Sequence, residues 1–545
     1  MCTPNLKNCL VPWLFFSIVG ANILSMSVMS FFETEVSLLP VVYLLCLFMS
    51  FFLVKRSKID FPVITRKHHW MALAFGFFLT LPRLPYLLEP ILGYSVGAAC
   101  WDDWWHIQEF ASIIYSGNFP PKETFTNNKF LSFYYSSLML GSALFSSSLF
   151  VTVKQAIFIS YLVYNVLFSY MVFYAANIIY VGSSRQRNFF ILLVVFYGGF
   201  DFFYGITFFI YELIASGEIV FKHAEWWAHA FGLHVQFPSF FTLALWVPHH
   251  LMSAAALFFG IYCLLKNQVS LTSAVIAGIS FAFALFSSVF VTIGALPVVL
   301  YFMFSYRVAR ANVMLCAATG GIVSVPVIWM YLGRGGDGFV MFVSGIAVFE
   351  RYRILGFMVF LLIMLLEFLP IVYGIVSRYS RGLGGSGLFF AAFAVMLSTF
   401  FVSYHGTGNY AMRASIVPML VMVYLAVPAV VGALELSQSK FIAVLALSPF
   451  LLGGIWEYFS FSQSALSSAR KVSDFQKNAY LSNSAKYNYV EGAVEKEAYN
   501  HEFGWYMLEN RKTIPKRDIA HQDKELMCSD NRFRITYDKI KILLK

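Results

Sequence analysis

Residues 101–109, with the sequence WDDWWHIQE, carry the side chains of this chain that are best suited to chemistry. Asp102, His106 and Glu109 are spaced at i, i+4 and i+7, so a helix here would place all three on one face. A carboxylate with a like-charged neighbour such as Asp103 can hold a proton near neutral pH, as general acid–base catalysis requires. Because tryptophan favours the headgroup layer, the run predicts an amphipathic helix at the bilayer surface with an acidic, protonatable face.

A second polar segment, residues 217–250, concentrates histidine and tryptophan. It contains HAEWW at its centre and ends in WVPHH. Its candidate binding residues are Glu225, Trp226, Gln236, His249 and His250. Histidine and glutamate are zinc ligands, but no HExxH or comparable spacing occurs. We therefore expect no metal, with a divalent ion as the alternative.

Glu109, Tyr134 and three arginines complete the set of candidate binding residues. Arg334, Arg351 and Arg413 lie near the ends of later apolar runs. A guanidinium group binds phosphate oxygens through two parallel hydrogen bonds, so these positions indicate an anionic ligand, with Arg413 first among them. The alternative is that Arg413 only extends its charge into the headgroup layer.

The elements that must position these residues are membrane helices. Of the 545 residues, 59% are hydrophobic and 12% are charged, and the mean hydropathy is +0.70. Apolar runs of about 20 residues recur, each long enough to cross ~30 Å of hydrocarbon. The sequence predicts an all-α polytopic membrane protein with about 13 transmembrane helices. Much of the net charge of +10 lies in basic clusters between these runs, so no nucleic-acid partner is expected.

The basic clusters also set the expected orientation. Residues 55–69 hold the strongest cluster, so the positive-inside rule places this loop and the N-terminus in the cytoplasm. Both large polar segments then face outward, but simple alternation also puts Arg185 and Arg187 outside, against the rule. Parity is restored if residues 189–215, which are interrupted by YGGFD, form a re-entrant hairpin. It is also restored if these residues cross and one more crossing lies within residues 130–181.

The composition divides the chain into three parts. Residues 1–69 form an N-terminal two-span region, and residues 70–456 form the membrane core with outer loops 91–131 and 217–250. Residues 457–545 are more polar and are expected to be a small extracytoplasmic tail. No Walker or GxGxxG loop is present, so the sequence predicts no nucleotide cofactor.

Five short motifs follow one another along the core: DDWWH at 102–106, GNFPP at 117–121, SFYY at 132–135, WVPHH at 246–250 and NYAMRASI at 409–416. Together they resemble elements of a bacterial-type branch of the GT-C superfamily, membrane glycosyltransferases that take sugars from polyprenyl-phosphate carriers. Tyr410 departs from the family pattern, which commonly has an aspartate there, and this puts an acidic role at that position in doubt.

The resemblance implies a GT-C-like bundle with large outward-facing loops. It implies that Asp102, or Asp103 as second choice, is the general base for an acceptor hydroxyl that attacks the anomeric carbon with inversion. The donor would be a polyprenyl-phosphate-linked sugar, and the acceptor a glycan, a lipid or a protein. The implied location is a bacterial inner membrane, with the lipid bilayer as partner, the active face periplasmic and no cofactor.

Each assignment has an alternative that the sequence leaves open. Asp102 and Asp103 can cap the interfacial helix, and the tryptophans can anchor the loops or stack on sugar rings. His106 is a third catalytic candidate, which could position Asp102 or the acceptor through a hydrogen bond, with metal ligation as its alternative. A transporter or flippase of a lipid-linked or anionic substrate would also explain the apolar runs. It predicts ionisable residues near the bilayer midplane. A non-catalytic subunit with the same fold is a further alternative.

Overall fold

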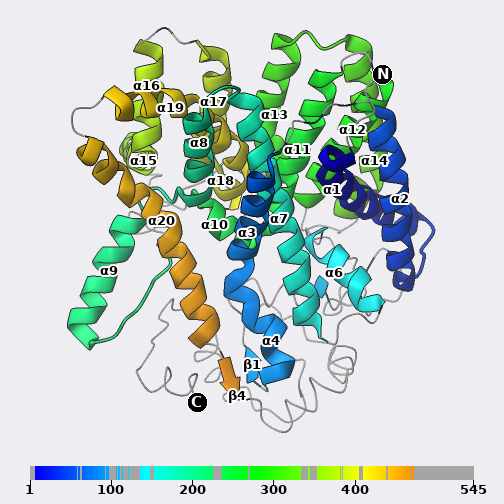
Figure 1. Ribbon diagram of the computed structural model, residues 1–545, viewed down its shortest axis with the longest axis horizontal. Helices are drawn as coiled ribbons and strands as arrows, with labels where there is room; N and C mark the ends of the chain where they lie inside the picture. Colours follow the sequence, from blue (N-terminus) through cyan, green and yellow to red (C-terminus); the bar gives the residue numbers. More distant parts are fainter. Residues whose placement is uncertain are drawn as a thin grey trace.

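The chain folds into a bundle of helices in the computed structural model (Figure 1). The structure describes residues 6–57, 59, 61, 64–92, 94–96, 106, 109–110, 113–114, 119, 121, 136–147, 152–224, 236–267, 270–332, 342–343, 353–380, 382, 384–403, 409–436, 440–467 and 469–471. The α-helices of the first half are α1 (Leu6–Leu24), α2 (Leu39–Ser57), α3 (Arg66–Thr80), α4 (Leu84–Leu92), α6 (Ser136–Ser146), α7 (Val153–Ile179), α8 (Ser184–Phe196), α9 (Asp201–Ser216), α10 (Phe240–Trp246) and α11 (Pro248–Lys266). Those of the second half are α12 (Leu271–Ser287), α13 (Val289–Ser305), α14 (Arg310–Leu332), α15 (Arg353–Glu367), α16 (Leu369–Ser380), α17 (Ser386–Phe401), α18 (Asn409–Ala414), α19 (Ile416–Leu436) and α20 (Lys440–Ser467).

Short irregular helices and strands connect the α-helices. The π-helix η1 (Ser25–Met29) and the 3-10 helices η2 (Val36–Leu38) and η3 (Leu81–Arg83) continue or precede longer helices. Strand β1 (Tyr94–Val96) pairs antiparallel with β4 (Ala469–Lys471), and β2 (Phe342–Val343) pairs antiparallel with β3 (Val402–Ser403). The first pair joins the start of the first polar loop to the end of α20, at the bottom of Figure 1.

Helix length and composition give the protein its membrane-spanning character. Among the described residues, six helices are long and apolar enough to cross a bilayer, and two bent helix pairs raise the number to eight if each pair is one span. Shorter apolar helices accompany them: α6, α12, α13 and α17. The structure confirms a helical, multi-pass membrane protein, whereas the predicted count of about 13 crossings stays a prediction.

Of the two spans predicted between the first polar loop and Arg185, one corresponds to a helix long enough to cross a bilayer and the other to a shorter apolar helix. Helix α6 has 11 residues and is about 16 Å long, roughly half the hydrocarbon thickness, whereas α7 has 27 residues. At the end of α7, the Asn177 amide lies 3.5 Å from His68 Nδ1 in the first turn of α3. Arg187 also interacts electrostatically with His68. The two basic clusters therefore share one face of the bundle, as the positive-inside rule requires.

The interruption predicted in residues 189–215 is the break between α8 and α9. The two helices meet at an angle of 46°, so the pair is either one broken span or a re-entrant segment. Gly198 packs against the backbone of α20, where a Cβ atom would lie 2.1 Å from the Gly454 nitrogen. Gly199 has a φ of +61°. These two glycines allow the break because they accept the close approach and the left-handed backbone.

A second break, between α15 and α16, bends the chain by 85°. Residues 355–376, predicted as one span, are therefore a bent helix pair. Glu367 ends α15 with 3% exposure, and its Oε2 accepts a hydrogen bond from the Phe200 N–H at 3.1 Å. The Tyr197 hydroxyl donates to the Glu367 carbonyl. The breaks of the two helix pairs thus pack against each other, and Asp201, 1% exposed, begins α9 beside them.

A chain of buried hydrogen bonds fixes α6, where the first polar loop ends. The Tyr43 hydroxyl donates to Asn22 Oδ1 at 3.2 Å, and Asn22 Nδ2 donates to the Tyr164 hydroxyl at 3.0 Å. That hydroxyl in turn donates to the carbonyl of Ser136. Polar groups inside a membrane bundle need such partners, so α1, α2, α6 and α7 are held in one arrangement.

Candidate functional site

A buried imidazole–carboxylate pair from the first polar loop forms the centre of the candidate site. His106 is 1% exposed and Glu109 is 3% exposed, and His106 Nδ1 lies 3.1 Å from Glu109 Oε2. Both residues are helical, three positions apart, which brings their side chains to one face. The sequence placed this face at the bilayer surface. These two side chains instead point into the protein, where other polar groups surround them.

Two histidines of the second polar segment meet this pair. Pro248 begins α11, and since the first N–H groups of a helix have no intrahelical acceptor, proline fits at that position. His249 and His250 follow in the first turn, both fully buried. The His249 ring lies 6.1 Å from the His106 ring and 4.1 Å from the His250 ring. Residues about 140 positions apart are thereby brought together.

Arg413 joins the cluster from α18. It is 6% exposed, it interacts electrostatically with both His249 and His250, and its guanidinium lies 6.0 Å from the Phe290 ring. Helix α18 packs directly on α13, where a Cβ atom on Gly294 would lie 2.1 Å from the carbonyl oxygen of Ala414. A charge buried to this degree is inconsistent with Arg413 merely reaching to the headgroups.

Tyr410, in the same motif, has a structural role. It is 5% exposed, and its hydroxyl lies 3.1 Å from Ser398 Oγ on α17. Its ring packs edge-on against Phe290 at 5.7 Å. Tyr410 therefore holds α18 against α13 and α17.

Arg83 and Tyr161 also belong to the cluster, and the sequence analysis missed both. Arg83 is 1% exposed, and its guanidinium lies 4.9 Å from the centre of the Tyr161 ring. The Tyr161 ring packs edge-on against His106 at 6.0 Å. One signal was available in the sequence, since Arg83 is a charged residue inside an apolar run, in LPRLP. Such residues are usually functional.

None of the remaining predicted site residues can be placed in this cluster. Gln236 is 6% exposed and precedes α10. The others lie outside the described residues: Asp102, Asp103, Tyr134, Glu225, Trp226, Arg334 and Arg351. Among the residues that the structure describes, no three His, Cys, Asp or Glu side chains are grouped so that they could hold a metal ion.

Residues 219–224, here called the strap, lead into the second polar loop and are bound along α20. Gln463 accepts from the Phe221 N–H and donates to the Ile219 carbonyl, both at 2.7 Å. Glu457, fully buried, accepts from the Ala224 N–H at 2.6 Å and from His223 Nδ1 at 2.9 Å. In Figure 1, the chain turns back at the lower end of α9 and runs upward between α9 and α20. Helix α20, which extends past residue 456, thus holds the start of this loop.

Replacing Glu457 with alanine should release the end of the strap. The variant loses two hydrogen bonds to a charged acceptor, which together stabilise the strap by about 2 kcal/mol or more. We expect hydrogen–deuterium exchange of residues 219–224 to become at least about 10-fold faster. Glu435→Ala is the control, because the exposed ion pair of Glu435 with Arg185 should contribute little. Unchanged exchange in the Glu457 variant would contradict the strap's dependence on this carboxylate.

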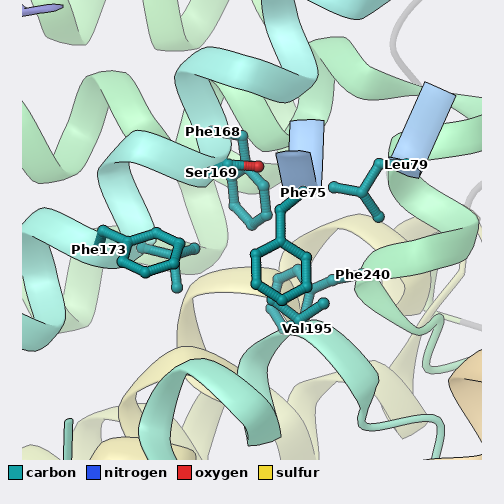
Figure 2. Close-up of a pocket in the computed structure, with 8 residues that line it drawn as sticks. Phe75, Leu79, Phe168, Ser169, Phe173, Val195 and Phe240 are labelled. Carbon is teal, nitrogen blue, oxygen red and sulfur yellow. The ribbon is translucent and has the colours of Figure 1, made fainter. Parts of the chain in front are cut away.

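Two cavities differ sharply in what they can hold. Figure 2 shows an apolar cavity of about 10 Å³ where α3, α7, α8 and α10 meet, with Ser169 among phenylalanines. It is no larger than a packing defect. A groove of about 700 Å³ lies between α1, α2, α6 and α7 and is lined almost wholly by apolar side chains such as Leu44, Leu140 and Val163. Of these two cavities, the groove has room for a lipid chain.

The cluster combines two chemical capabilities. An imidazole paired with a carboxylate can accept and return a proton, and two buried guanidinium groups can stabilise an anion. Both lie where bulk water has little access, which strengthens electrostatic interactions. Comparison of this chain with protein-family models, with curated proteins and with solved structures finds no match.

Proposed function

We propose that this protein transfers a sugar from a polyprenyl-phosphate carrier to an acceptor hydroxyl at one membrane face, with inversion at the anomeric carbon. The observation that carries the proposal is the buried cluster of His106, His249, His250 and Arg413. These residues come from three of the motifs that resemble the GT-C superfamily, and nothing in the resemblance required the motifs to meet. Their meeting supports a shared site.

Each part of the cluster suits one requirement of the reaction. The carrier leaves as a phosphate, whose negative charge is stabilised by Arg413 and by the first turn of α11, where the helix dipole is positive. The acceptor hydroxyl must lose its proton as it attacks, and the resemblance gives this role to Asp102. No metal or other cofactor is needed for these steps.

The apolar groove suits the isoprenoid chain of the carrier. One side of α6 contacts the candidate site, because the Phe110 ring lies 5.8 Å from the Phe145 ring and Phe110 follows Glu109. Another side of α6, including Leu140 and Leu144, lines the groove. A carrier with its chain in the groove would therefore have its phosphate near the cluster.

Orientation follows from the shared basic face. The clusters at residues 55–69 and 183–187 support a cytoplasmic position for that face. The polar loops and the strap then lie on the periplasmic face of a bacterial inner membrane. We keep the expectation of about 13 crossings as part of the proposal.

An assay of carrier cleavage tests the proposal. Purified protein in nanodiscs is incubated with a panel of polyprenyl-phosphate sugars and acceptors, and released polyprenyl phosphate is measured by mass spectrometry. We expect release by the wild type, and a loss of about 100-fold or more in Asp102→Asn if Asp102 is the general base. If the wild type releases no polyprenyl phosphate from any carrier, the proposal fails. If the wild type cleaves the carrier and Asp102→Asn is equally active, Asp102 is not the general base.

One feature favours transport as a second candidate function. Glu367 and Asp201 are buried at the facing breaks of two bent helix pairs, and broken helices with buried carboxylates are common in transporters. A transporter or flippase would move the lipid-linked substrate across the bilayer intact. The cleavage assay separates the two functions, because transport produces no free polyprenyl phosphate.

A further inference from the structure

The His106–Glu109 pair has the geometry of a proton-accepting dyad. Glu109 Oε2 lies 3.1 Å from His106 Nδ1, so an ionised Glu109 keeps the proton of a neutral imidazole on Nδ1. The lone pair of the ring is then on Nε2. A carboxylate that fixes the tautomer and orientation of a histidine in this way also stabilises the imidazolium that forms when Nε2 takes a proton.

The surroundings hold the His106 ring from its other sides. Tyr161 of α7 packs edge-on against it at 6.0 Å. The buried guanidinium of Arg83 lies over the Tyr161 ring and helps to hold that ring in place. His249 of α11 packs edge-on at 6.1 Å. Burying an ionised carboxylate costs free energy, and an imidazole with only a packing role would not need one beside it. The pair therefore indicates a functional role.

We infer that His106 is the group that takes the proton of the acceptor hydroxyl, and that Glu109 is its positioning residue. The inference rests on the proposed function and gives His106 the role that the resemblance gave to Asp102. The acceptor oxygen forms a bond to the anomeric carbon, and the bond from that carbon to the carrier phosphate oxygen breaks. The electron pair of that bond leaves with the polyprenyl phosphate. The hydroxyl proton moves to His106 Nε2, and the imidazolium is paired with the Glu109 carboxylate.

Other charged or titratable groups face this site and act on its pH dependence. Tyr161 comes from α7, His249 and His250 from α11, and Arg413 from α18. His250 interacts electrostatically with His106, His249 and Arg413. The guanidinium of Arg413 disfavours further positive charge in this cluster, whereas the negative charge of Glu109 favours the imidazolium form of His106.

The test compares kcat and KM across pH for wild type, Glu109→Gln, Glu109→Asp and His106→Asn in nanodiscs. Glu109→Gln should lower kcat by about 10- to 100-fold with little change in KM. It should also move the acid limb of the kcat profile to lower pH, because the imidazole becomes less basic. Glu109→Asp should restore part of kcat, and His106→Asn should lose about 100-fold or more.

Different outcomes separate this inference from the proposed function. Glu435→Gln, in an exposed ion pair, is the control for charge removal and should behave as wild type. If folded Glu109→Gln and His106→Asn keep the wild-type kcat and pH profile, the dyad is wrong and sugar transfer stands. A loss of kcat in Glu109→Gln without any change in the acid limb would also contradict the dyad. If the wild type cleaves no carrier, the proposed function itself has failed.

Discussion

Replacing Arg413 with glutamine should lower the rate of sugar transfer by about 100- to 1000-fold, as removal of one preorganised donor to a developing negative charge does in other enzymes. The guanidinium is buried and acts on both His249 and His250. Glutamine keeps hydrogen-bonding capacity and much of the volume but removes the charge. The loss should appear in kcat, because the leaving phosphate gains negative charge in the transition state.

Two further variants show whether charge or shape matters at this position. Arg413→Lys should recover part of the rate, because the ammonium supplies charge without the planar fork that binds two phosphate oxygens. Arg185→Gln removes an arginine from an exposed pair and should leave the rate unchanged. Transfer at the wild-type rate in a folded Arg413→Gln variant would exclude Arg413 from the site.

Replacing Gly199 with alanine should destabilise the fold by about 3 kcal/mol or more, since it combines backbone strain with overpacking. Gly199 has a φ of +61°, and a Cβ atom would lie 1.8 Å from Glu367 Oε1. The methyl group would push Glu367 away from the Phe200 N–H and separate the two helix breaks. The measurement is the thermal unfolding midpoint of the detergent-solubilised protein.

Gly217 provides a matched control for this substitution. Its φ is +72°, and nothing lies within 4 Å of a Cβ atom placed there, so Gly217→Ala carries the backbone strain without the collision. That variant should lose only about 1 kcal/mol. Equal shifts of the unfolding midpoint in the two variants would mean that the contact between the breaks contributes nothing to stability.

The fold class and several site residues could be predicted from the sequence because they depend on local patterns. Apolar runs of the right length specify membrane helices in any arrangement. His106, Glu109, His249 and Arg413 stand out because ionisable residues beside such runs are costly unless they have a role. The structure brings all four together.

The path of the chain between these residues could not be predicted in the same way. Residues 132–152 are apolar and serine-rich over the length of a full span, and composition does not reveal that α6 ends after 11 residues. The polar groups that fix α6, such as Asn22 and Tyr164, come from other helices.

Residues whose role depends on tertiary contacts could not be predicted from the sequence either. Tyr161 lies in an apolar stretch of α7 and has no distinguishing neighbour, so only its contacts with Arg83 and His106 identify it. Glu367 lay inside a predicted span. Its hydrogen-bond partner, the Phe200 N–H, is 167 positions away in the sequence. Long-range packing of this kind leaves no periodic signal in the sequence.

The most direct test of the central claim uses proteoliposomes that contain the wild-type protein, an acceptor and a polyprenyl-phosphate sugar. Free polyprenyl phosphate, glycosylated acceptor and transbilayer movement of the intact carrier are measured in one sample. Sugar transfer at the buried cluster predicts that polyprenyl phosphate and glycosylated acceptor form in equal amounts. Movement of the intact carrier across the bilayer, with no cleavage for any carrier in the panel, would contradict it.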